Sequence, residues 1–476
     1  MKLLIIDDEP AIVEVLIARI AAAGMTLEHS SAASHASALA AMETNDIDLI
    51  VCDLRMPTVD GALDADVMHG TAIYGKARAT MPGTPVIVLS AYGDDQTVAD
   101  MLQLSPHDDP FGTGSTLPML QYAVKTPDLA DCVGKIRIAY DGLQSLESVD
   151  LSPDPEDLEI PASASRVMKI FGRRRKAAVV RFATIDGGLS DARVFRVRAE
   201  DHQGALAGLA VGKIASVDEV NDENDRYERY IVALLPQTIF TIRVMMVRTG
   251  AADTGGIFYT LEEAYDHSLF DLVANLPSVA AACVEALQSG TVAWRGDRPT
   301  RQMTVGEIRR LSLPDNRITE LVEERLAGFR WQELEERVVT ARLCPQHCDL
   351  HGLNVIASEA GGARLIDYGL VAEAPAALDP VTLELSPIFH KKGPAFGNEW
   401  PTVSDCEQWV HRKKFVDSAP FPEYLHKCRA WSFGEAGSNA EVFATTYAYV
   451  ARQLAYPETN VERARGIIQA CHDALS

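Results

Sequence analysis

The chain has 476 residues, of which 47% are hydrophobic, and a formal net charge of −23 with an isoelectric point near 4.9. This length and hydrophobic content allow about two to four folded domains. The acidic balance disfavours binding to a nucleic-acid backbone, which needs clustered positive charge. The one basic run, residues 173–176, turns apolar at once and fits the solvated start of a strand, so no nucleic-acid partner is expected.

Cysteine usage and the first residues bear on the compartment. The eight cysteines show no CxxC pair, which is typical of reduced thiols. Cys344, His347 and Cys348 are not expected to hold a metal, because no second ligand pair follows at zinc spacing. The opening "MKLLIIDDEP" is apolar for too few residues to be a signal peptide or a membrane span. We therefore expect a cytoplasmic protein that makes no membrane contact.

Residues 1–147 alternate short aliphatic runs with amphipathic stretches, as in a doubly wound α/β domain. The runs "KLLIID", "DLIVCD" and "TPVIVLS" indicate buried parallel strands. Between the first two, "AIVEVLIARIAAAG" has helical spacing and ends at Gly24, a typical helix terminus.

Residues 148–166 are rich in Ser, Pro and acids and nearly free of aromatics, which predicts a flexible linker. After it, residues 167–262 read as antiparallel strands with a Gly-rich turn, followed by a helix that begins near Ser216 and a further strand. Helical patterns dominate residues 263–476. This order, a strand-rich lobe before a helix-rich lobe, predicts an α+β architecture.

Carboxylates gather at the predicted strand ends of the first domain. Asp7 and Asp8 end the first strand and Asp53 ends the third, at the edge where parallel sheets place their sites. Carboxylates so close together repel one another unless a hard cation lies among them, which predicts a Mg²⁺ site. Ser90 and Lys125 end two further strands and would lie beside it.

These residues carry a resemblance to the response-regulator receiver domain, which has a flavodoxin-like fold. The motifs are "DDE" at 7–9, "DLRMPTVDG" at 53–61, "VIVLSA" at 86–91 and "YAVKTP" at 122–127. The resemblance implies that Asp53 accepts phosphate, that Asp7 and Asp8 bind Mg²⁺ with it, and that Ser90 and Lys125 contact the phosphoryl group. Tyr122 is a switch aromatic or simply a strand aromatic. Two stretches, around 64–76 and 104–116, look inserted relative to the family.

A second constellation lies in "RLCPQHCDLHGLNVIASEAGGARLIDYGL", residues 342–370. Asp349 and Asn354 are five residues apart, and Asp367 follows on another aliphatic run. For phosphoryl transfer, one carboxylate can take the proton of the acceptor hydroxyl while an amide and a second carboxylate hold Mg²⁺ on nucleotide phosphates.

"QHCDLHGLNVI" followed by "LIDYG" resembles the aminoglycoside and choline kinase group, whose fold is the bilobal protein-kinase-like one. The resemblance implies that Asp349 is the catalytic base, that His347 buttresses its loop, and that Asn354 and Asp367 are metal ligands. The downstream acids Asp379 and Glu384 are expected to be structural.

A kinase also needs nucleotide-binding elements upstream. Gly187 and Gly188 with Ser190 would cradle a phosphate, although hairpins use the same residues. Lys213 ends an apolar run, where an ammonium needs a partner or a phosphate. Glu223 is its best partner, and two other acids of the same stretch, Glu219 and Glu228, remain alternatives. "GGIFYTLEEA" at 255–264 resembles the hinge between kinase lobes.

The sequence thus predicts a two-component-type bacterial signalling protein: a receiver joined to a kinase-like, ATP-dependent phosphotransferase. Its partners would be a histidine kinase or other phosphodonor, ATP with Mg²⁺, and a hydroxyl acceptor or protein that no pattern identifies. Homodimerisation through the receiver is compatible with this prediction. The alternative is a catalytically silent, nucleotide-binding kinase fold that serves as a regulated interaction module or scaffold.

Overall fold

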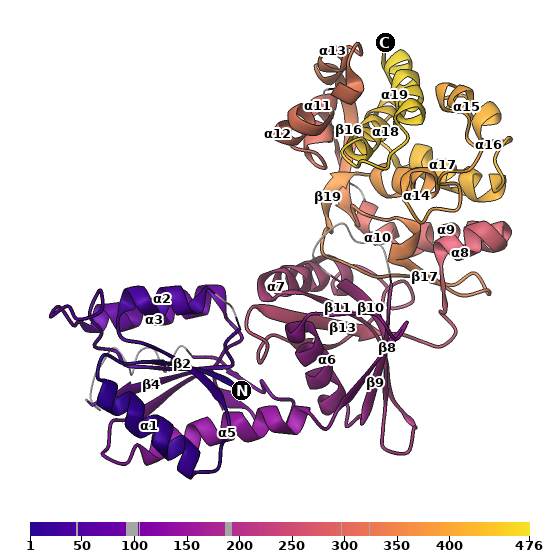
Figure 1. Ribbon diagram of the computed structural model, residues 1–476. Coiled ribbons are helices and arrows are strands. Elements are labelled where there is room, and N and C mark those ends of the chain that lie inside the picture. Colours follow the sequence, from indigo (N-terminus) through magenta and orange to yellow (C-terminus); the bar gives the residue numbers. More distant parts are fainter. Residues whose placement is uncertain (44–45, 92–102, 104, 186–192, 297, 323) are drawn as a thin grey trace. The chain divides into compact units, whose positions relative to one another are not determined.

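The computed structural model describes residues 1–43, 46–91, 103, 105–185, 193–296, 298–322 and 324–476 (Figure 1). The chain divides into two compact units. The first comprises Met1–Asn221 and Arg243–Thr260, and the second Asp222–Ile242 and Leu261–Ser476. Each unit is described below by itself.

The first unit begins with a five-stranded, all-parallel sheet in the order β2-β1-β3-β4-β7. Apolar side chains alternate across it, so one face packs on α1 and α5 and the other on α2 and α3 (Figure 1). The predicted doubly wound fold is confirmed. Its elements are β1 (Lys2–Ile6), α1 (Pro10–Ala22), β2 (Glu28–Ala32), α2 (His35–Met42), β3 (Leu49–Cys52), α3 (Val67–Thr80), β4 (Val86–Ser90), β7 (Leu120–Val124) and α5 (Ala130–Leu146).

The same unit contains a six-stranded sheet in the order β12-β13-β11-β10-β9-β8. Its pairs are antiparallel except β8 with β9, and helix α6 packs on it. This sheet is the strand-rich part of the α+β architecture that the sequence predicts for the later chain. The elements are β8 (Asp150–Asp154), α6 (Ala162–Arg174), β9 (Val179–Thr184), β10 (Arg193–Glu200), β11 (Leu206–Ser216), β12 (Arg243–Val247) and β13 (Thr254–Thr260).

The expectation of a flexible linker at 148–166 is wrong. Residues 150–154 form β8, which pairs in parallel with β9, and α6 begins at Ala162. A composition rich in Ser, Asp and Pro does not exclude a strand here, because β8 is an edge strand, where such residues and even Pro153 are tolerated. Val149, directly before the strand, is 2% exposed and anchors the segment in the core.

The inserted stretch at 104–116 has a structural use. Residues 105–119 carry the small strands β5 (His107–Asp108) and β6 (Leu117–Pro118). Phe111 lies in one continuous apolar core with residues of α5, α6 and β10. The Arg174 guanidinium of α6 donates to the carbonyl oxygens of Asp109, at 2.7 Å, and Met246, at 2.9 Å. The five-stranded and six-stranded sheets therefore share a core rather than being joined by a tether.

A backbone contact reinforces this joint. Gly83 N donates to Ala252 O at 2.8 Å, and Gly250 N donates to Gly83 O at 2.8 Å. A Cβ at Gly250, where φ is +93°, would lie 2.0 Å from the carbonyl oxygen of Pro110. The turn between β12 and β13 thus fits against the segment that contains Pro110 only with glycine at this position.

The second unit is mainly helical and holds two three-stranded sheets, β14-β17-β18 and β15-β16-β19. Helix α7 (Val217–Arg226) crosses the unit boundary and continues as the π-helix η1 (Tyr227–Val232). The strands are β14 (His267–Ser268), β15 (Thr300–Thr304), β16 (Val338–Gln346), β17 (Val355–Ala357), β18 (Ala363–Leu365) and β19 (Ala372–Pro375).

The helices of this unit include short π and 3₁₀ turns. They are α8 (Leu269–Asn275), α9 (Pro277–Gly290), α10 (Val292–Arg295), α11 (Val305–Arg310), α12 (Asp315–Arg317), η2 (Ile318–Val322), η3 (Glu324–Leu326), α13 (Trp331–Glu335), η4 (Gly352–Asn354), α14 (Leu378–Phe389), α15 (Val403–Glu407), α16 (Arg412–Val416), α17 (Pro422–Glu435), α18 (Asn439–Gln453) and α19 (Val461–Leu475).

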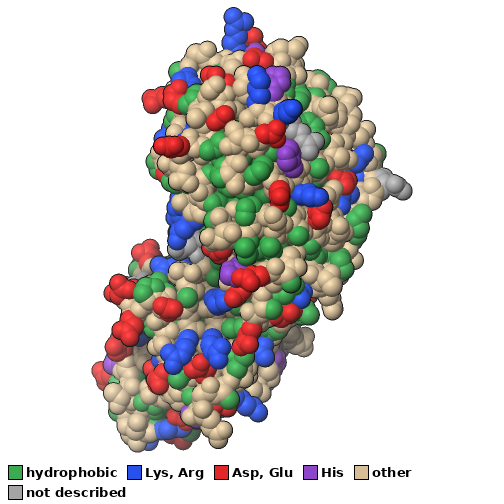
Figure 2. All heavy atoms as spheres, turned by 90° about the vertical axis from the view of Figure 1, so that its right-hand side faces the viewer, with side chains coloured by type: hydrophobic (Ala, Val, Ile, Leu, Met, Phe, Trp, Pro, Cys, Tyr) green, Lys and Arg blue, Asp and Glu red, His purple; other side chains and the backbone are tan. Residues whose placement is uncertain are grey.

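Three further features of the described residues concern surface charge, membrane-spanning helices and cysteine pairing. On the face drawn in Figure 2, acidic and basic side chains are interspersed rather than segregated. None of the described helices is long and apolar enough to cross a bilayer. All eight cysteines are unpaired.

Candidate functional site

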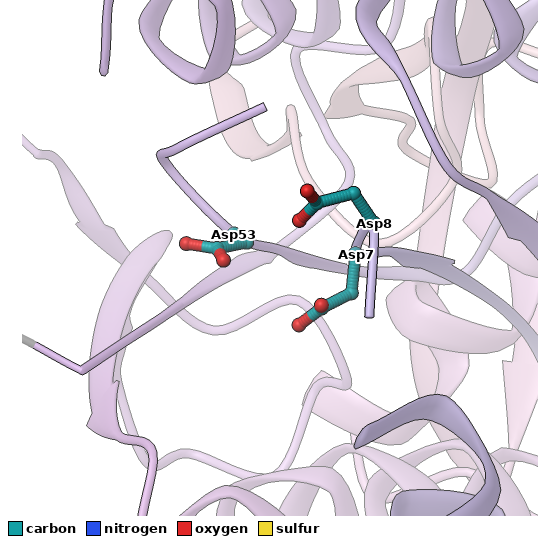
Figure 3. Close-up of side chains that lie close together, drawn as sticks. All are labelled: Asp7, Asp8 and Asp53. Carbon is teal, nitrogen blue, oxygen red and sulfur yellow. The ribbon is translucent and has the colours of Figure 1, made fainter. Parts of the chain in front are cut away.

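The acid pocket of the first sheet forms where four parallel strands end. Register pairs Ile6 with Cys52 and Ser90 with Val124, so the residues that follow these strands meet at one edge. The ligand oxygens of Asp7, Asp8 and Asp53 lie within 4.8 Å of one another. Figure 3 shows the three side chains pointing to the same side of the strand ends. The predicted trio is therefore brought together.

Lys125 supplies the counter-charge in this pocket. Its Nζ lies 2.6 Å from Asp53 Oδ2, 2.9 Å from Asp7 Oδ2 and 3.2 Å from Glu9 Oε1. Burial raises the pKa of Asp7 to about 6, although Lys125 opposes the shift. The carboxylates of Asp7, Asp8 and Asp53 sum with the Lys125 ammonium to −2, and the exposed Glu9 adds a further negative charge. A divalent cation therefore suits both the charge and the oxygen donors.

The other two predicted receiver residues lie near this edge. Ser90 is the last residue of β4 and is 5% exposed, and Lys125 N donates to its carbonyl oxygen at 2.9 Å. Tyr122 lies within β7, is half-buried and packs against the core on the α2 and α3 side of the sheet. Its place suits either predicted reading, so its role as a switch stays a prediction.

In the second unit, β16 leads directly into the loop that carries Asp349. The backbone N–H groups of His347 and Cys348 donate to the two carboxylate oxygens of Asp379, at 2.7 and 3.0 Å. Asn354 Nδ2 donates to the carbonyl oxygen of Asp349 at 2.8 Å. Burial raises the pKa of Asp379 to about 6, although these N–H groups oppose the shift. Asp379 thus fixes the loop backbone, as expected for a structural acid.

The segment that ends in Asp367 is tied to the same loop. Ile366 N donates to Asn354 O at 3.0 Å, and His347 Nε2 donates to Ile366 O at 2.9 Å. Tyr368 is buried, and its hydroxyl accepts a bond from Thr241 N at 3.0 Å and makes a second bond with the Thr241 hydroxyl at 2.9 Å. The predicted base, its buttress and Asn354 therefore belong to one hydrogen-bonded assembly, and Ile366, directly before Asp367, is bonded to it.

Two residues of this assembly have left-handed backbones. Cys348 has φ +66° and Asp367 has φ +62°. Such conformations cost non-glycine residues about 1–3 kcal/mol and persist where the surroundings enforce them, commonly at functional sites. Here Cys348 directly precedes the predicted base Asp349, and Asp367 is itself a predicted metal ligand.

The Asp349 carboxylate has two basic neighbours. Arg452, on α18, donates from its Nη2 to Oδ1 at 3.2 Å, and His351 Nε2 lies 3.7 Å from Oδ2. Burial acts to raise the pKa of Asp349, but Arg452, His351 and His347 outweigh it and the net shift is downward. Sequence reasoning missed both neighbours. His351 could have been noticed two residues after Asp349, but Arg452 is 103 residues away.

The predicted nucleotide-binding residues are placed only in part. Lys213 lies in β11, opposite Val194 of β10 and Ile257 of β13, in the first unit. Glu223 is 1% exposed in the second unit, and its Oε1 accepts a bond from Tyr368 N at 3.4 Å. The pairing of Lys213 with Glu223 stays a prediction. Gly187, Gly188 and Ser190 lie outside the described residues.

The two alternatives to Glu223 differ from it in burial. Glu219 is exposed and accepts bonds from the backbone and hydroxyl of Ser216, as a helix-capping residue does. Glu228 is exposed on η1. Glu384 is fully buried against Arg429, with 2.9 Å between Oε1 and Nε, and is structural as expected.

Comparison with known proteins identifies the first domain. Residues 3–108 match the family model of the response regulator receiver domain. Two curated relatives are the transcriptional regulatory proteins GlrR of Escherichia coli K12 and QseF of Escherichia coli O157:H7. Each is 32% identical over 91 residues, which is 19% of this chain and 18% of the relative. The match therefore covers less than a fifth of each relative.

Two solved structures are similar to portions of the chain. A CheY-like receiver domain protein of Methanospirillum hungatei JF-1 is 21% identical, covering 30% of this chain and 96% of its own, with a TM-score of 0.23. An aminoglycoside-3'-phosphotransferase of type VIII is 20% identical, covering 52% of this chain and 92% of its own, with a TM-score of 0.31.

Proposed function

We propose, from the premise that residues 3–108 are a response-regulator receiver domain, that the chain is a two-component-type signalling protein. In it, phosphorylation of Asp53 regulates an ATP-dependent phosphotransferase whose base is Asp349. The observation that carries the proposal is the presence of two separate acid assemblies, one around Asp53 and one around Asp349.

The receiver half of the proposal depends on the charge balance around Asp53. Asp7, Asp8 and Asp53 would hold Mg²⁺, which neutralises charge on an incoming phosphoryl group. The Asp53 carboxylate would form the new O–P bond, and Lys125, already 2.6 Å from it, would pair with a phosphoryl oxygen. The donor would be a partner histidine kinase, whose N–P bond would break with the electron pair returning to the imidazole, or a small acyl phosphate, whose O–P bond would break with release of the carboxylate.

Labelling tests this half. Acetyl phosphate with Mg²⁺ should label the wild type at one hydroxylamine-sensitive site, and Asp53→Asn should abolish the label. The matched control is Asp141→Asn, which replaces an exposed carboxylate on α5, and this variant should be labelled to the same extent as the wild type. Continued labelling of Asp53→Asn at the same stoichiometry would refute the assignment.

The phosphotransferase half depends on the loop around Asp349. The Asn354 amide uses its N–H toward the loop backbone, which leaves its Oδ1 to bind a cation together with Asp367. Asp349 would orient the acceptor hydroxyl and take its proton as the oxygen attacks the γ-phosphorus of ATP. Lys213 would pair with the nucleotide phosphates, with Glu223 as its proposed partner.

Nucleotide binding and turnover test this half separately. ATP with Mg²⁺ should raise the melting temperature, and ATP consumption should depend on Asp349. Asp349→Ala should bind ATP without consuming it, whereas Asp473→Ala, an exposed carboxylate, should behave as wild type. Stabilisation by ATP without Asp349-dependent turnover would instead favour a catalytically silent nucleotide-binding module. The absence of both stabilisation and turnover would favour a scaffold.

Regulation is supported by the shared core of the first unit. The receiver and the β8–β13 sheet that carries Lys213 have one continuous apolar core and backbone hydrogen bonds between them. A change in the receiver would therefore strain a packed joint rather than a loose tether. We propose this joint as the route from Asp53 to the nucleotide-binding sheet.

A further inference from the structure

Arg452 stands out because it is a cation placed directly on the proposed base. Its side chain is 20% exposed and its Nη2 lies 3.2 Å from Asp349 Oδ1. A guanidinium carries five N–H donors in a planar fork that matches carboxylate and phosphate oxygens. A carboxylate held this way is a poor proton acceptor, because its negative charge is already compensated.

Two histidines extend the basic surroundings of Asp349. His351 Nδ1 accepts a bond from Leu353 N at 3.3 Å, so its proton resides on Nε2, which faces Asp349 at 3.7 Å. The His390 ring centre lies 4.7 Å from that of His351, and Phe270 packs against both rings. His390 Nδ1 likewise accepts a bond, from Lys392 N at 3.1 Å, so its proton resides on Nε2.

The segment after His390 adds further positive charge. Lys391 and Lys392 are exposed directly after it in the chain. These lysines are cationic in a chain with a net charge of −23. A cationic acceptor would meet repulsion from Arg452 at the base, whereas an anionic one would find N–H donors there.

We infer that Arg452, His351 and His390 form an anion subsite, and that the acceptor is a small hydroxyl compound carrying a carboxylate or phosphate near its hydroxyl. The inference rests on the proposed phosphotransferase function. On binding, the acceptor's anion takes Arg452 from Asp349. The freed carboxylate accepts the hydroxyl proton, the acceptor oxygen bonds to the γ-phosphorus, and the bond to the bridging oxygen breaks with its electron pair leaving on ADP.

Binding of inorganic phosphate, measured by calorimetry in the presence of Mg²⁺ and a non-hydrolysable ATP analogue, tests the subsite. Arg452→Met should weaken phosphate binding at least tenfold. Asp349→Asn should strengthen it severalfold, because the internal competitor for the guanidinium loses its charge. Arg301→Met, an exposed arginine of β15, should leave binding unchanged. A merely structural Arg452 predicts no gain from Asp349→Asn.

The acceptor arm uses matched three-carbon compounds. ATP consumption should rise with glycerate or glycerol 3-phosphate rather than with glycerol, and the better of the two anions shows whether carboxylate or phosphate is preferred. Equal or stronger stimulation by glycerol, choline or an aminoglycoside would overturn the inference. The inference would also be overturned if the wild type did not bind phosphate, if Arg452→Met bound phosphate as the wild type does, or if Asp349→Asn did not bind phosphate more tightly. Loss of binding of the ATP analogue itself would instead sink the proposed function.

Discussion

Arg174→Met tests whether the receiver and the β8–β13 sheet unfold as one unit. The wild-type guanidinium makes two hydrogen bonds to carbonyl oxygens, at 2.7 and 2.9 Å, while its side chain is 18% exposed. Methionine keeps the apolar stem and removes the donors together with the positive charge. Hydrogen bonds from charged groups contribute about 1.5–3 kcal/mol each, so the loss should be about 3 kcal/mol at the lower end. The flanking ion pairs at 3.5 and 3.8 Å add less than about 1 kcal/mol.

Hydrogen exchange is the suitable assay, because all five tryptophans lie at or after residue 294 and report only the second unit. A loss of about 3 kcal/mol should speed exchange of the most protected amides about 100-fold, since each 1.4 kcal/mol is a factor of about ten. The expectation is the same factor in β3 and in β10. Arg19→Met, an exposed arginine of α1, is the control and should change neither. Faster exchange confined to one of the two sheets would refute the shared unit.

Three further predictions concern stability. Gly250→Ala should destabilise the protein by more than Gly204→Ala, because both have positive φ but only the first would place a Cβ 2.0 Å from a carbonyl oxygen; equal unfolding midpoints would contradict this. Arg429→Met should cost about 3–5 kcal/mol because it leaves Glu384 buried without its partner, whereas Glu147→Gln removes an exposed pair with Lys169 and should cost at most about 1 kcal/mol in the same denaturation assay. Burial raises the pKa of Asp379 from 3.8 to about 6, so its contribution to stability is full below the unfolded value and is lost as pH rises through 6. Asp379→Asn should therefore flatten the decline in unfolding free energy between pH 4 and pH 7, by about 3 kcal/mol at most; an unchanged slope would show that this group does not titrate there.

The sequence was informative wherever one strand or one loop carries the signal. Aliphatic runs such as "TPVIVLS" predicted buried parallel strands, and the rule that such strands place polar ends at one edge predicted the meeting of Asp7 with Asp53. The link between Asp349 and Asn354 followed in the same way, because five residues of one loop cannot separate far.

Contacts between distant segments were beyond the sequence. Residues 148–166 look disordered by composition, yet pairing of β8 with β9 orders part of them, and pairing is a property of the neighbour. The stretch at 104–116 looks like an insertion in the sequence, and nothing in it predicts the hydrogen bond from Arg174, 65 residues away, to Asp109 O. Arg452 reaches Asp349 only because α18 and β16 pack together, which no spacing encodes.

The most direct test of the account is the rate of ATP consumption with and without beryllofluoride, a phosphoryl mimic, bound at Asp53. The account predicts a severalfold change of rate in the wild type, no change in Asp53→Asn, and no consumption in Asp349→Ala with or without the mimic. An identical wild-type rate, with occupancy of Asp53 confirmed, would contradict the claim that the two acid sites are coupled.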